Sequence, residues 1–329
     1  MTPDVGAESP GLAQHLVRLY TDVTIPFDLL RWPRRDRQRT PTTATAISSG
    51  APIRPTGSCP KGCEIKNPGY RGRLQPNYDA ALSALSIRIV AGIGRAIAER
   101  LAKDGATVAL TYNASKSGAD EAVAVIEKAG GTAFAIHADL VDPATVPALF
   151  ERLDNEFTKR NGSNALDILV NNAGNSGWVG LKDATLDSWD TLIAVYARAP
   201  FFIVQAALDR LADGGRIINI SSAAATKPVT AAPVYSMAKA AINNLTYALA
   251  SELGPRRITA NAVAPGYTRT DGNAAIRENP ALVKAVEAEI ALGRFGEPSE
   301  IAAVVAFLAS DEGHWVTGQT IEASGGYKL

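Results

Sequence analysis

The chain has 329 residues, of which 46% are hydrophobic and 20% are charged, and its 33 basic residues equal its 33 acidic ones. This length allows one large domain or two modest ones. A net charge of zero argues against a nucleic-acid or anionic-membrane partner. Two cysteines exclude a disulfide scaffold, and no run of about 18 apolar residues offers a membrane span. These features predict a soluble, cytoplasmic protein.

The first 80 residues differ in composition from the rest. They hold 11 Lys and Arg against 7 Asp and Glu, and 10 of the 19 prolines. Dense proline removes backbone donors and interrupts regular elements, so we expect a largely disordered extension over residues 1–80 and a folded domain over 81–329. The basic run over residues 31–39 allows a second interpretation, contact with a polyanion. Cys59 and Cys63 supply only two thiolates where zinc takes four ligands, so we predict no metal site.

The remainder alternates short apolar runs with amphipathic stretches. We predict strands over residues 107–112, 132–137, 166–170, 216–221, 257–263 and 320–323, preceded by a weak, alanine- and serine-rich candidate over 80–86. Helices are predicted over 94–104, 118–129, 144–157, 187–211, 234–253 and 299–309. Near-continuous apolar strands joined by helices indicate buried parallel strands. The predicted fold is a single-domain α/β protein with a Rossmann-type, doubly wound parallel sheet.

Short runs that contain small or polar residues follow the predicted strands one after another. They are Gly92, Ile93 and Gly94; Asp139 and Leu140; Asn171, Asn172, Ala173 and Gly174; Ser221 and Ser222; and Pro265 and Gly266. An open parallel sheet binds its ligands outside the carboxyl ends of its strands. A ligand site is therefore expected at this edge.

Tyr235 and Lys239 stand four residues apart in a predicted helix, which places them on one face. A free tyrosine has a pKa near ~10 and is a poor acid or base at neutral pH, but a neighbouring ammonium lowers that pKa. Ser222, at a strand end, offers a hydroxyl to a substrate oxygen. Alone, such a pair is usually an ordinary surface pair, but the residues at the strand ends favour a catalytic site.

From about Gly92 to Gly326 the chain resembles the short-chain dehydrogenase/reductase family, above all its 3-oxoacyl-[acyl-carrier-protein] reductase-like members and similar carbonyl reductases. The resemblance is carried by Gly92, Ile93 and Gly94, by Asp139, residues 171–174, Ser222, Tyr235 and Lys239, and by the runs 261–266, 293–298 and 316–326. It implies hydride transfer between a nicotinamide and a small carbonyl or alcohol substrate. It also implies a homo-oligomer, tetramer or dimer.

The resemblance assigns a role to each site residue. Tyr235 protonates the carbonyl oxygen, Ser222 holds that oxygen, and Lys239 binds the nicotinamide ribose and depresses the pKa of Tyr235. The implied cofactor contacts, besides Tyr235 and Lys239, are Gly92, Ile93, Gly94, Asp139, Leu140, Asn172, Ala173, Gly174, Pro265, Gly266 and Thr268.

The residues after the strand 107–112 bear on the choice of cofactor. A carboxylate there would bind the ribose 2′-hydroxyl of NAD and repel the 2′-phosphate of NADP. The chain has none, and Asn113, Ser115 and Lys116 supply donors and a positive charge instead. We therefore expect NADP(H) rather than NAD(H). The alternative is that Lys116 is an ordinary solvated loop residue.

Two departures from the family pattern stand at functional positions. The phosphate loop of the family begins Thr-Gly, where this chain has Ile87 and Arg88, and Tyr196 takes the place of the usual asparagine. A competing hypothesis is therefore a catalytically weakened dinucleotide-binding protein that acts by association. Another is that the first 80 residues come from a misread gene start, exon boundary or frameshift. Trp178, just after residues 171–174, either lines the substrate entrance or packs against its neighbours.

Overall fold

A computed structural model describes residues 82–87, 92–172, 174 and 177–329 of the chain. Three of the predictions fall outside the described residues: the extension over residues 1–80, the departure at Arg88 and the cofactor contact of Ala173. Among the helices so described, none is both long enough and apolar enough to cross a membrane.

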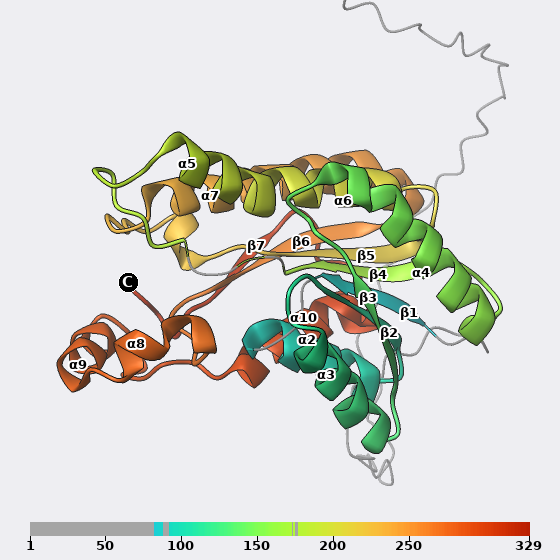
Figure 1. Cartoon of the computed structure of the whole chain (residues 1–329), viewed down its shortest axis with the longest axis horizontal. Helices are drawn as coiled ribbons and strands as arrows, with labels where there is room; N and C mark the ends of the chain where they lie inside the picture. Colours follow the sequence, from blue (N-terminus) through green and yellow to red (C-terminus); the bar gives the residue numbers. More distant parts are fainter. Residues whose placement is uncertain (1–81, 88–91, 173, 175–176) are drawn as a thin grey trace, which may run out of the picture. The chain divides into compact units, whose positions relative to one another are not determined.

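Seven parallel strands form one sheet in the order β3-β2-β1-β4-β5-β6-β7 (Figure 1). Their bounds are β1 Ser83–Ile87, β2 Thr107–Tyr112, β3 Thr132–His137, β4 Leu166–Asn171, β5 Leu211–Ile220, β6 Thr259–Pro265 and β7 Thr320–Ala323. The strand order reverses between β1 and β4, where a doubly wound sheet opens a crevice at its carboxyl edge. The predicted Rossmann-type fold is confirmed.

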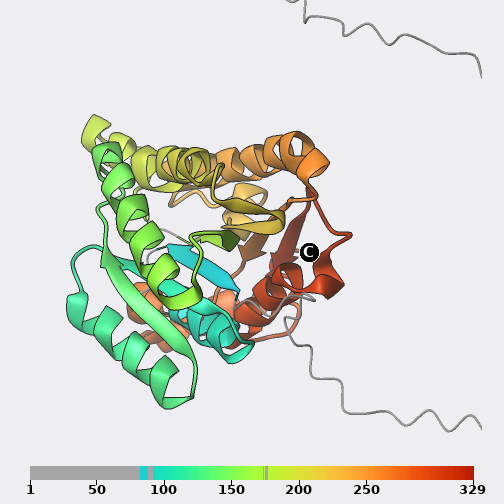
Figure 2. The ribbon, with the colours of Figure 1, turned by 90° about the vertical axis from the view of Figure 1, so that its right-hand side faces the viewer.

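Helices cover both faces of the sheet (Figure 2). On one face lie α2 (Gly92–Lys103), α3 (Lys116–Lys128) and α10 (Pro298–Ala309). On the other lie α4 (Val146–Asn161), α5 (Leu186–Ile193), α6 (Ala199–Ala207) and α7 (Pro233–Leu253). The strand side chains are buried between these two layers, which makes the sheet the centre of the core.

Two shorter helices, α8 (Ala274–Arg277) and α9 (Pro280–Ala288), follow β6. Neither helix was predicted from the sequence. Five one-turn 3-10 segments complete the elements; they are η2 (Pro143–Thr145), η4 (Ala223–Ala225), η5 (Gly254–Arg256), η6 (Asp271–Asn273) and η7 (Asp311–Gly313).

The weak first-strand candidate becomes a central strand. β1 runs over residues 83–87 between β2 and β4, and Leu85 pairs with Ala109 on one side and Leu169 on the other. Ala84 and Leu85 have no exposed surface. The small side chains that make this run a poor strand by propensity fit between helices packed on both faces of the sheet.

The single helix predicted over residues 187–211 is wrong. The chain forms α5, then a π-helical turn η3 (Ala194–Arg198), then α6, and residue 211 already belongs to β5. The Ala199 N–H donates to the Ala194 carbonyl, five residues back. Pro200 has no N–H to continue the α-helical pattern, which explains the change of hydrogen bonding at this point.

Candidate active site

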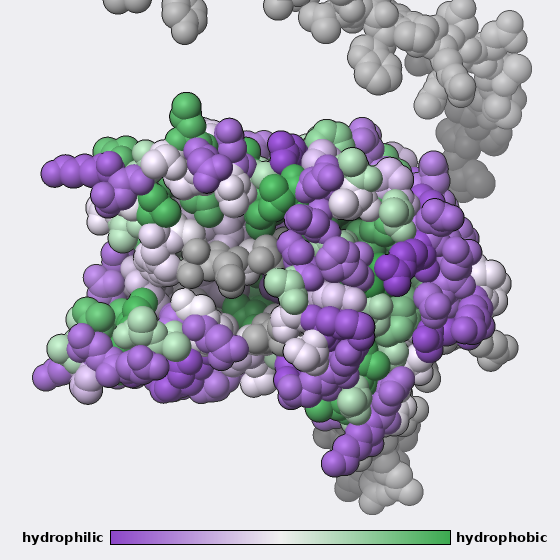
Figure 3. Space-filling model, in the orientation of Figure 1, coloured by the Kyte–Doolittle hydropathy of each residue, from purple (hydrophilic) through white to green (hydrophobic). Residues whose placement is uncertain are grey.

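A cavity of about 550 Å³ lies at the carboxyl ends of the strands. Figure 3 shows the molecule hollowed between the layer of α5 and α7 and the segment of α8 and α9. The residues that line the cavity come from the start of α2, the ends of β2, β4, β5 and β6, and the N-terminal half of α7. This is where an open parallel sheet is expected to bind its ligands.

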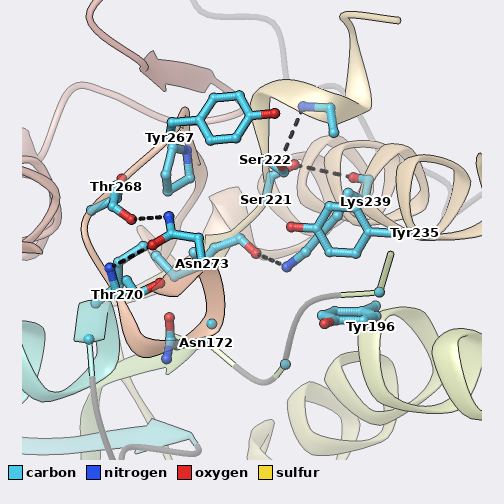
Figure 4. A pocket seen from close by; sticks show the side chains of 18 of the residues that line it. Asn172, Tyr196, Ser221, Ser222, Tyr235, Lys239, Tyr267, Thr268, Thr270 and Asn273 are labelled. Carbon is cyan, nitrogen blue, oxygen red and sulfur yellow. Dashed lines mark hydrogen bonds between the residues drawn. The ribbon is translucent and has the colours of Figure 1, made fainter. Parts of the chain in front are cut away.

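Ser222, Tyr235 and Lys239 meet at one end of the cavity (Figure 4). Ser222 follows β5, and its hydroxyl is hydrogen-bonded to the phenol of Tyr235 on α7. Lys239 lies one turn further along α7, and its Nζ donates to the Ile220 carbonyl at 2.6 Å. The structure therefore brings the three predicted catalytic residues to one place.

Burial dominates the electrostatics of this end. It raises the pKa of Tyr235, which the hydrogen bond with Ser222 partly offsets. It lowers the pKa of Lys239 to about 7. The net shift of the Tyr235 pKa is therefore upward, opposite to the direction that we predicted from Lys239, whose Nζ lies 5.7 Å from the centre of the Tyr235 ring and donates to a carbonyl.

Tyr196 completes this group from the π-helical turn η3. Its ring is buried and packs edge-on against the Tyr235 ring, with centroids 5.0 Å apart and planes at 86°. Lys239 Nζ lies 4.7 Å from the centre of the Tyr196 ring, in cation–π range. A Cβ at Gly174 would lie 1.9 Å from Tyr196 Cε1, so only glycine fits beside this ring.

Buried hydrogen bonds hold the strands and the helix in register behind the site. Asn171 Nδ2 donates to Asn219 Oδ1, and Asn219 Nδ2 donates to Thr246 Oγ1, both at 2.9 Å. This series connects β4, β5 and α7. Ser221 Oγ also donates to the Lys239 carbonyl at 3.2 Å. The ends of β5 and α7 therefore keep a fixed relation to each other.

The other end of the cavity fits a dinucleotide. Gly92, Ile93 and Gly94 line it at the first turn of α2, where free backbone N–H groups favour an anion. Gly92 has φ +64°, and a Cβ there would lie 2.8 Å from Thr270 Cγ2, so glycine permits this close approach. Asp271 also lines the cavity. Together with Gly92 it lines a second, adjoining hollow beside the start of α2.

A profile of the family described as "Enoyl-(Acyl carrier protein) reductase" matches residues 89–328 of this chain. The chain is 41% identical over 238 residues to an uncharacterised oxidoreductase of Methylorubrum extorquens, a match that covers 72% of this chain and 94% of that protein. It is 37% identical to the 3-oxoacyl-[acyl-carrier-protein] reductase FabG of Staphylococcus aureus, over 74% and 97% of the two chains.

The crystal structure of the angucycline C-6 ketoreductase LanV with bound NADP superposes with a TM-score of 0.72 at 43% identity, covering 75% of this chain and 96% of that one. The keto-reductase LugOII matches with the same score and identity over 75% and 97%. This chain belongs to the short-chain dehydrogenase/reductase family. As a member of it, the protein is an oxidoreductase.

Most of the cofactor contacts predicted for this reductase line the cavity. They are Gly92, Ile93, Gly94, Asn113, Ser115, Asn172, Gly174, Tyr235, Lys239, Pro265, Gly266 and Thr268. Lys116 does not, because its side chain is 68% exposed and its Nζ lies 2.7 Å from Asp120. Asp139 and Leu140 are also outside the lining; Asp139 accepts from the Val141 N–H, and Leu140 is buried. Their contacts with adenine stay a prediction.

Tyr267 and Asn273 were not among the individually predicted site residues, although Tyr267 lies within the predicted run 265–268, and both line the cavity. Asn273 Nδ2 donates to the Thr268 carbonyl at 2.7 Å, and its Oδ1 accepts from the Thr270 N–H at 3.3 Å. It thereby fixes the turn that follows β6. The position of Tyr267 directly after Pro265 and Gly266 is the sequence signal that points to the cavity.

Proposed function

We propose that this protein reduces the carbonyl group of a ketone or 3-oxoacyl compound to an alcohol, or catalyses the reverse reaction, with NADP(H) as cofactor. The observation that carries the proposal is the meeting of Ser222, Tyr235 and Lys239 at one end of a cavity whose other end opens on the N-terminus of α2. The reductases LanV and LugOII, similar in sequence and fold, support carbonyl reduction.

NADPH, when bound, supplies the hydride. Tyr235 gives its phenolic proton to the carbonyl oxygen, so that the carbonyl π bond is replaced by new C–H and O–H bonds. Ser222, already hydrogen-bonded to Tyr235, holds the same oxygen in line with that proton. The resulting phenolate takes a proton back before the next turnover. Lys239, behind Tyr235, stabilises the phenolate when it carries its own charge.

The side chains after β2 support the choice of NADP(H). Asn113 and Ser115 line the cavity, and residues 113–116 contain no carboxylate that would repel a 2′-phosphate. Lys116 follows Ser115 in sequence and is paired with Asp120, so a bound 2′-phosphate would compete with that carboxylate for the exposed ammonium. The NADP bound to LanV agrees with this choice.

A second candidate function is dinucleotide binding with weakened catalysis, and Tyr196 is the observation that favours it. The family places an asparagine and a water-linked proton relay at this point. Here an aromatic ring covers Lys239, while Nζ is held by the Ile220 carbonyl. Proton return to Tyr235 is then the step that the substitution slows.

We also propose that residues 81–329 form the reductase domain and that the protein works as a homo-oligomer, tetramer or dimer, in the cytoplasm. Exposed aromatic side chains on α5, α6 and α7 support self-association; they are Trp189, Phe201, Phe202 and Tyr247. Apolar patches of this kind mark interaction surfaces. Sedimentation analysis that finds only monomer at micromolar concentration would contradict the oligomer.

The test is oxidation of NADPH or NADH by the purified full chain with a panel of ketones, quinones and 3-oxoacyl thioesters. We expect turnover with NADPH to exceed that with NADH. Tyr235→Phe removes the proton donor and keeps the ring, so we expect at least about a 100-fold loss of turnover with unchanged NADPH binding. NADPH binding without turnover in the unaltered chain would favour the second candidate. Turnover that survives Tyr235→Phe would sink the proposed mechanism.

A further inference from the structure

Two aromatic rings lie nearly parallel to each other in the cavity that contains Tyr235. Trp178 and Tyr267 both line it, their ring centroids are 6.5 Å apart, and their planes are within 17° of parallel. The geometry points to a substrate with a flat aromatic or fused-ring system, held by stacking on these two rings. This inference rests on the proposed function and narrows its substrate class to aromatic ketones.

Tyr267 is a rigid platform. Its ring is held edge-on by Phe295, at 5.8 Å and 69°, and by Tyr327, at 5.4 Å and 80°. Its hydroxyl is hydrogen-bonded to Tyr327, which is hydrogen-bonded in turn to Glu289. An aromatic ring fixed by two edge contacts and a hydrogen-bonded series presents a face of constant orientation.

Trp178 is the adjustable partner. Its side chain is 47% exposed, and no hydrogen bond to it is found among the described residues. Gly177, the residue before Trp178, packs closely against Tyr235 and Leu192. A Cβ at Gly177 would lie 3.2 Å from Tyr235 Cβ and 2.7 Å from Leu192 Cδ2. Trp178 therefore follows a residue that contacts Tyr235, and its half-exposed ring has open space on one side into which it can shift.

A flat ring fits between the two side chains once they separate slightly. Carbon atoms in van der Waals contact lie about 3.5 Å apart, so one inserted ring needs two faces about 7 Å apart. The Trp178 and Tyr267 centroids are 6.5 Å apart, within the range of two rings that stack directly with an offset. The exposed Trp178 ring must therefore shift outward to admit the substrate. The small apolar residues Ala223, Val229 and Ala232 also line the cavity, which suits an apolar ring system.

The charges beside this end do not favour a 3-oxoacyl group delivered by an acidic carrier protein. Two lysines stand close in sequence to lining residues: Lys328 directly follows Tyr327, and Lys227 lies two residues before Val229. Lys227 Nζ lies 4.0 Å from the Glu322 carboxylate, and Lys328 Nζ lies 3.7 Å from that of Glu289. Each ammonium also donates to a backbone carbonyl at 3.2 Å. These cations are balanced within the chain, which weakens steering of an acidic partner.

The experiment compares 1-tetralone, a fused-ring ketone, with acetoacetyl-coenzyme A, a linear 3-oxoacyl thioester, in the full chain with NADPH. We expect kcat/KM for 1-tetralone to exceed that for the thioester by at least about tenfold. Trp178→Ala should lower the tetralone value by about tenfold and the thioester value less than about twofold, since stacking is lost only for the flat substrate. Trp178→Phe should restore most of the loss. Trp315→Ala is the matched control, since Trp315 is 90% exposed and outside the cavity lining.

Failure of the inference and failure of the proposed function give different results. Turnover of acetoacetyl-coenzyme A without turnover of 1-tetralone keeps the reductase and overturns the aromatic substrate class. If neither compound reacts, the proposed function fails, and binding of 1-naphthol by calorimetry decides the inference. Binding that Trp178→Ala abolishes and Trp315→Ala retains supports the stacking site. Absence of 1-naphthol binding overturns it.

Discussion

At the residue scale, the surroundings of Lys239 set this reductase apart. The ammonium lies between the Ile220 carbonyl at 2.6 Å and the face of the Tyr196 ring at 4.7 Å. Both contacts partly replace water for a buried charge, which would otherwise be costly. An asparagine at position 196 would leave more open volume beside the ammonium, and water would fill it. In the proposed mechanism, Tyr196 therefore controls whether protons reach Tyr235 past Lys239.

Replacing Tyr196 by Asn should raise kcat by about tenfold, because it opens the proton route that limits the return of Tyr235 to its phenol form. The pH profile of kcat should move as well. Hydration of Lys239 relieves the burial that lowers its pKa to about 7, so the alkaline limb should shift to higher pH. Initial rates over a pH series measure both effects. An unchanged kcat would show that Tyr196 does not limit turnover, and Arg88, which stands where the family pattern has a glycine, would be the next residue to replace.

Gly174 provides the matched control for this variant. Gly174→Ala places a Cβ 1.9 Å from Tyr196 Cε1 and also strains a backbone at φ +144°. The backbone strain is the same whether residue 196 is tyrosine or asparagine, but the clash is not. Gly174→Ala should therefore cost more activity beside Tyr196 than beside asparagine. Equal losses in both backgrounds would show that the ring does not press on this turn.

At the element scale, continuous apolar runs made several strands predictable to the residue. The bounds of β2 and β3 match their predictions, because buried parallel strands need apolar side chains at nearly every position. The bounds of β7 match as well, although this strand is only half-buried. The π-helical turn η3 escaped prediction, since its five-residue hydrogen bond leaves the helical periodicity almost intact. Amphipathic α7 carries both Tyr235 and Lys239, so their proximity was predictable from spacing.

Other parts of the site depend on contacts between distant segments. Trp178 and Tyr267 are far apart in sequence and meet only because the ends of β4 and β6 reach the same edge of the sheet. The direction of the Tyr235 pKa shift was mispredicted for a related reason. Spacing placed Lys239 nearby, but burial and the Ile220 carbonyl, which decide the effect, are tertiary features.

Burial of Lys239 in α7 has a consequence for stability. Its pKa falls from 10.5 in the unfolded chain to about 7 in the folded one. Below about pH 7 both states hold the proton and the folded state bears the full cost of a buried ammonium. As the pH rises from about 7 to about 10.5, only the unfolded state holds the proton, so this cost is progressively relieved.

Lys239→Met should therefore raise the Tm relative to the unaltered chain at about pH 6, and this difference should shrink toward about pH 10. The pH-dependent part is of the order of a few kcal/mol, lessened by the Tyr196 and Ile220 contacts. Loss of the bond to Ile220 is nearly independent of pH and does not change the trend. Thermal melts across the pH range measure this difference in Tm. Lys116→Met, at an exposed lysine, is the control, and its difference in Tm should not change with pH. A difference that stays constant with pH would contradict a buried, titrating Lys239.

At the scale of the whole molecule, the described part of the sheet begins at residues 82 and 83. The Leu82 carbonyl accepts from the Thr107 N–H at 2.7 Å, and Ser83 pairs with Thr107 as the first residue of the ladder. Ser83 also receives support from β4, because its N–H donates to Asp167 at 2.8 Å. The sheet therefore requires the chain from residue 82 onward, whatever precedes it.

Deleting residues 1–80 should leave the Tm within about 2 °C of the full chain and leave turnover unchanged, because β1 and every described contact of the sheet are retained. Deleting residues 1–88 should prevent folding or lower the Tm by more than about 10 °C, because it removes a central strand whose Ala84 and Leu85 are fully buried. Thermal melts and NADPH oxidation on the three proteins give the answer. A large drop in Tm after deletion of residues 1–80 would show that the extension contributes to the fold. An unchanged Tm after deletion of residues 1–88 would show that residues 83–87 are not the strand between β2 and β4.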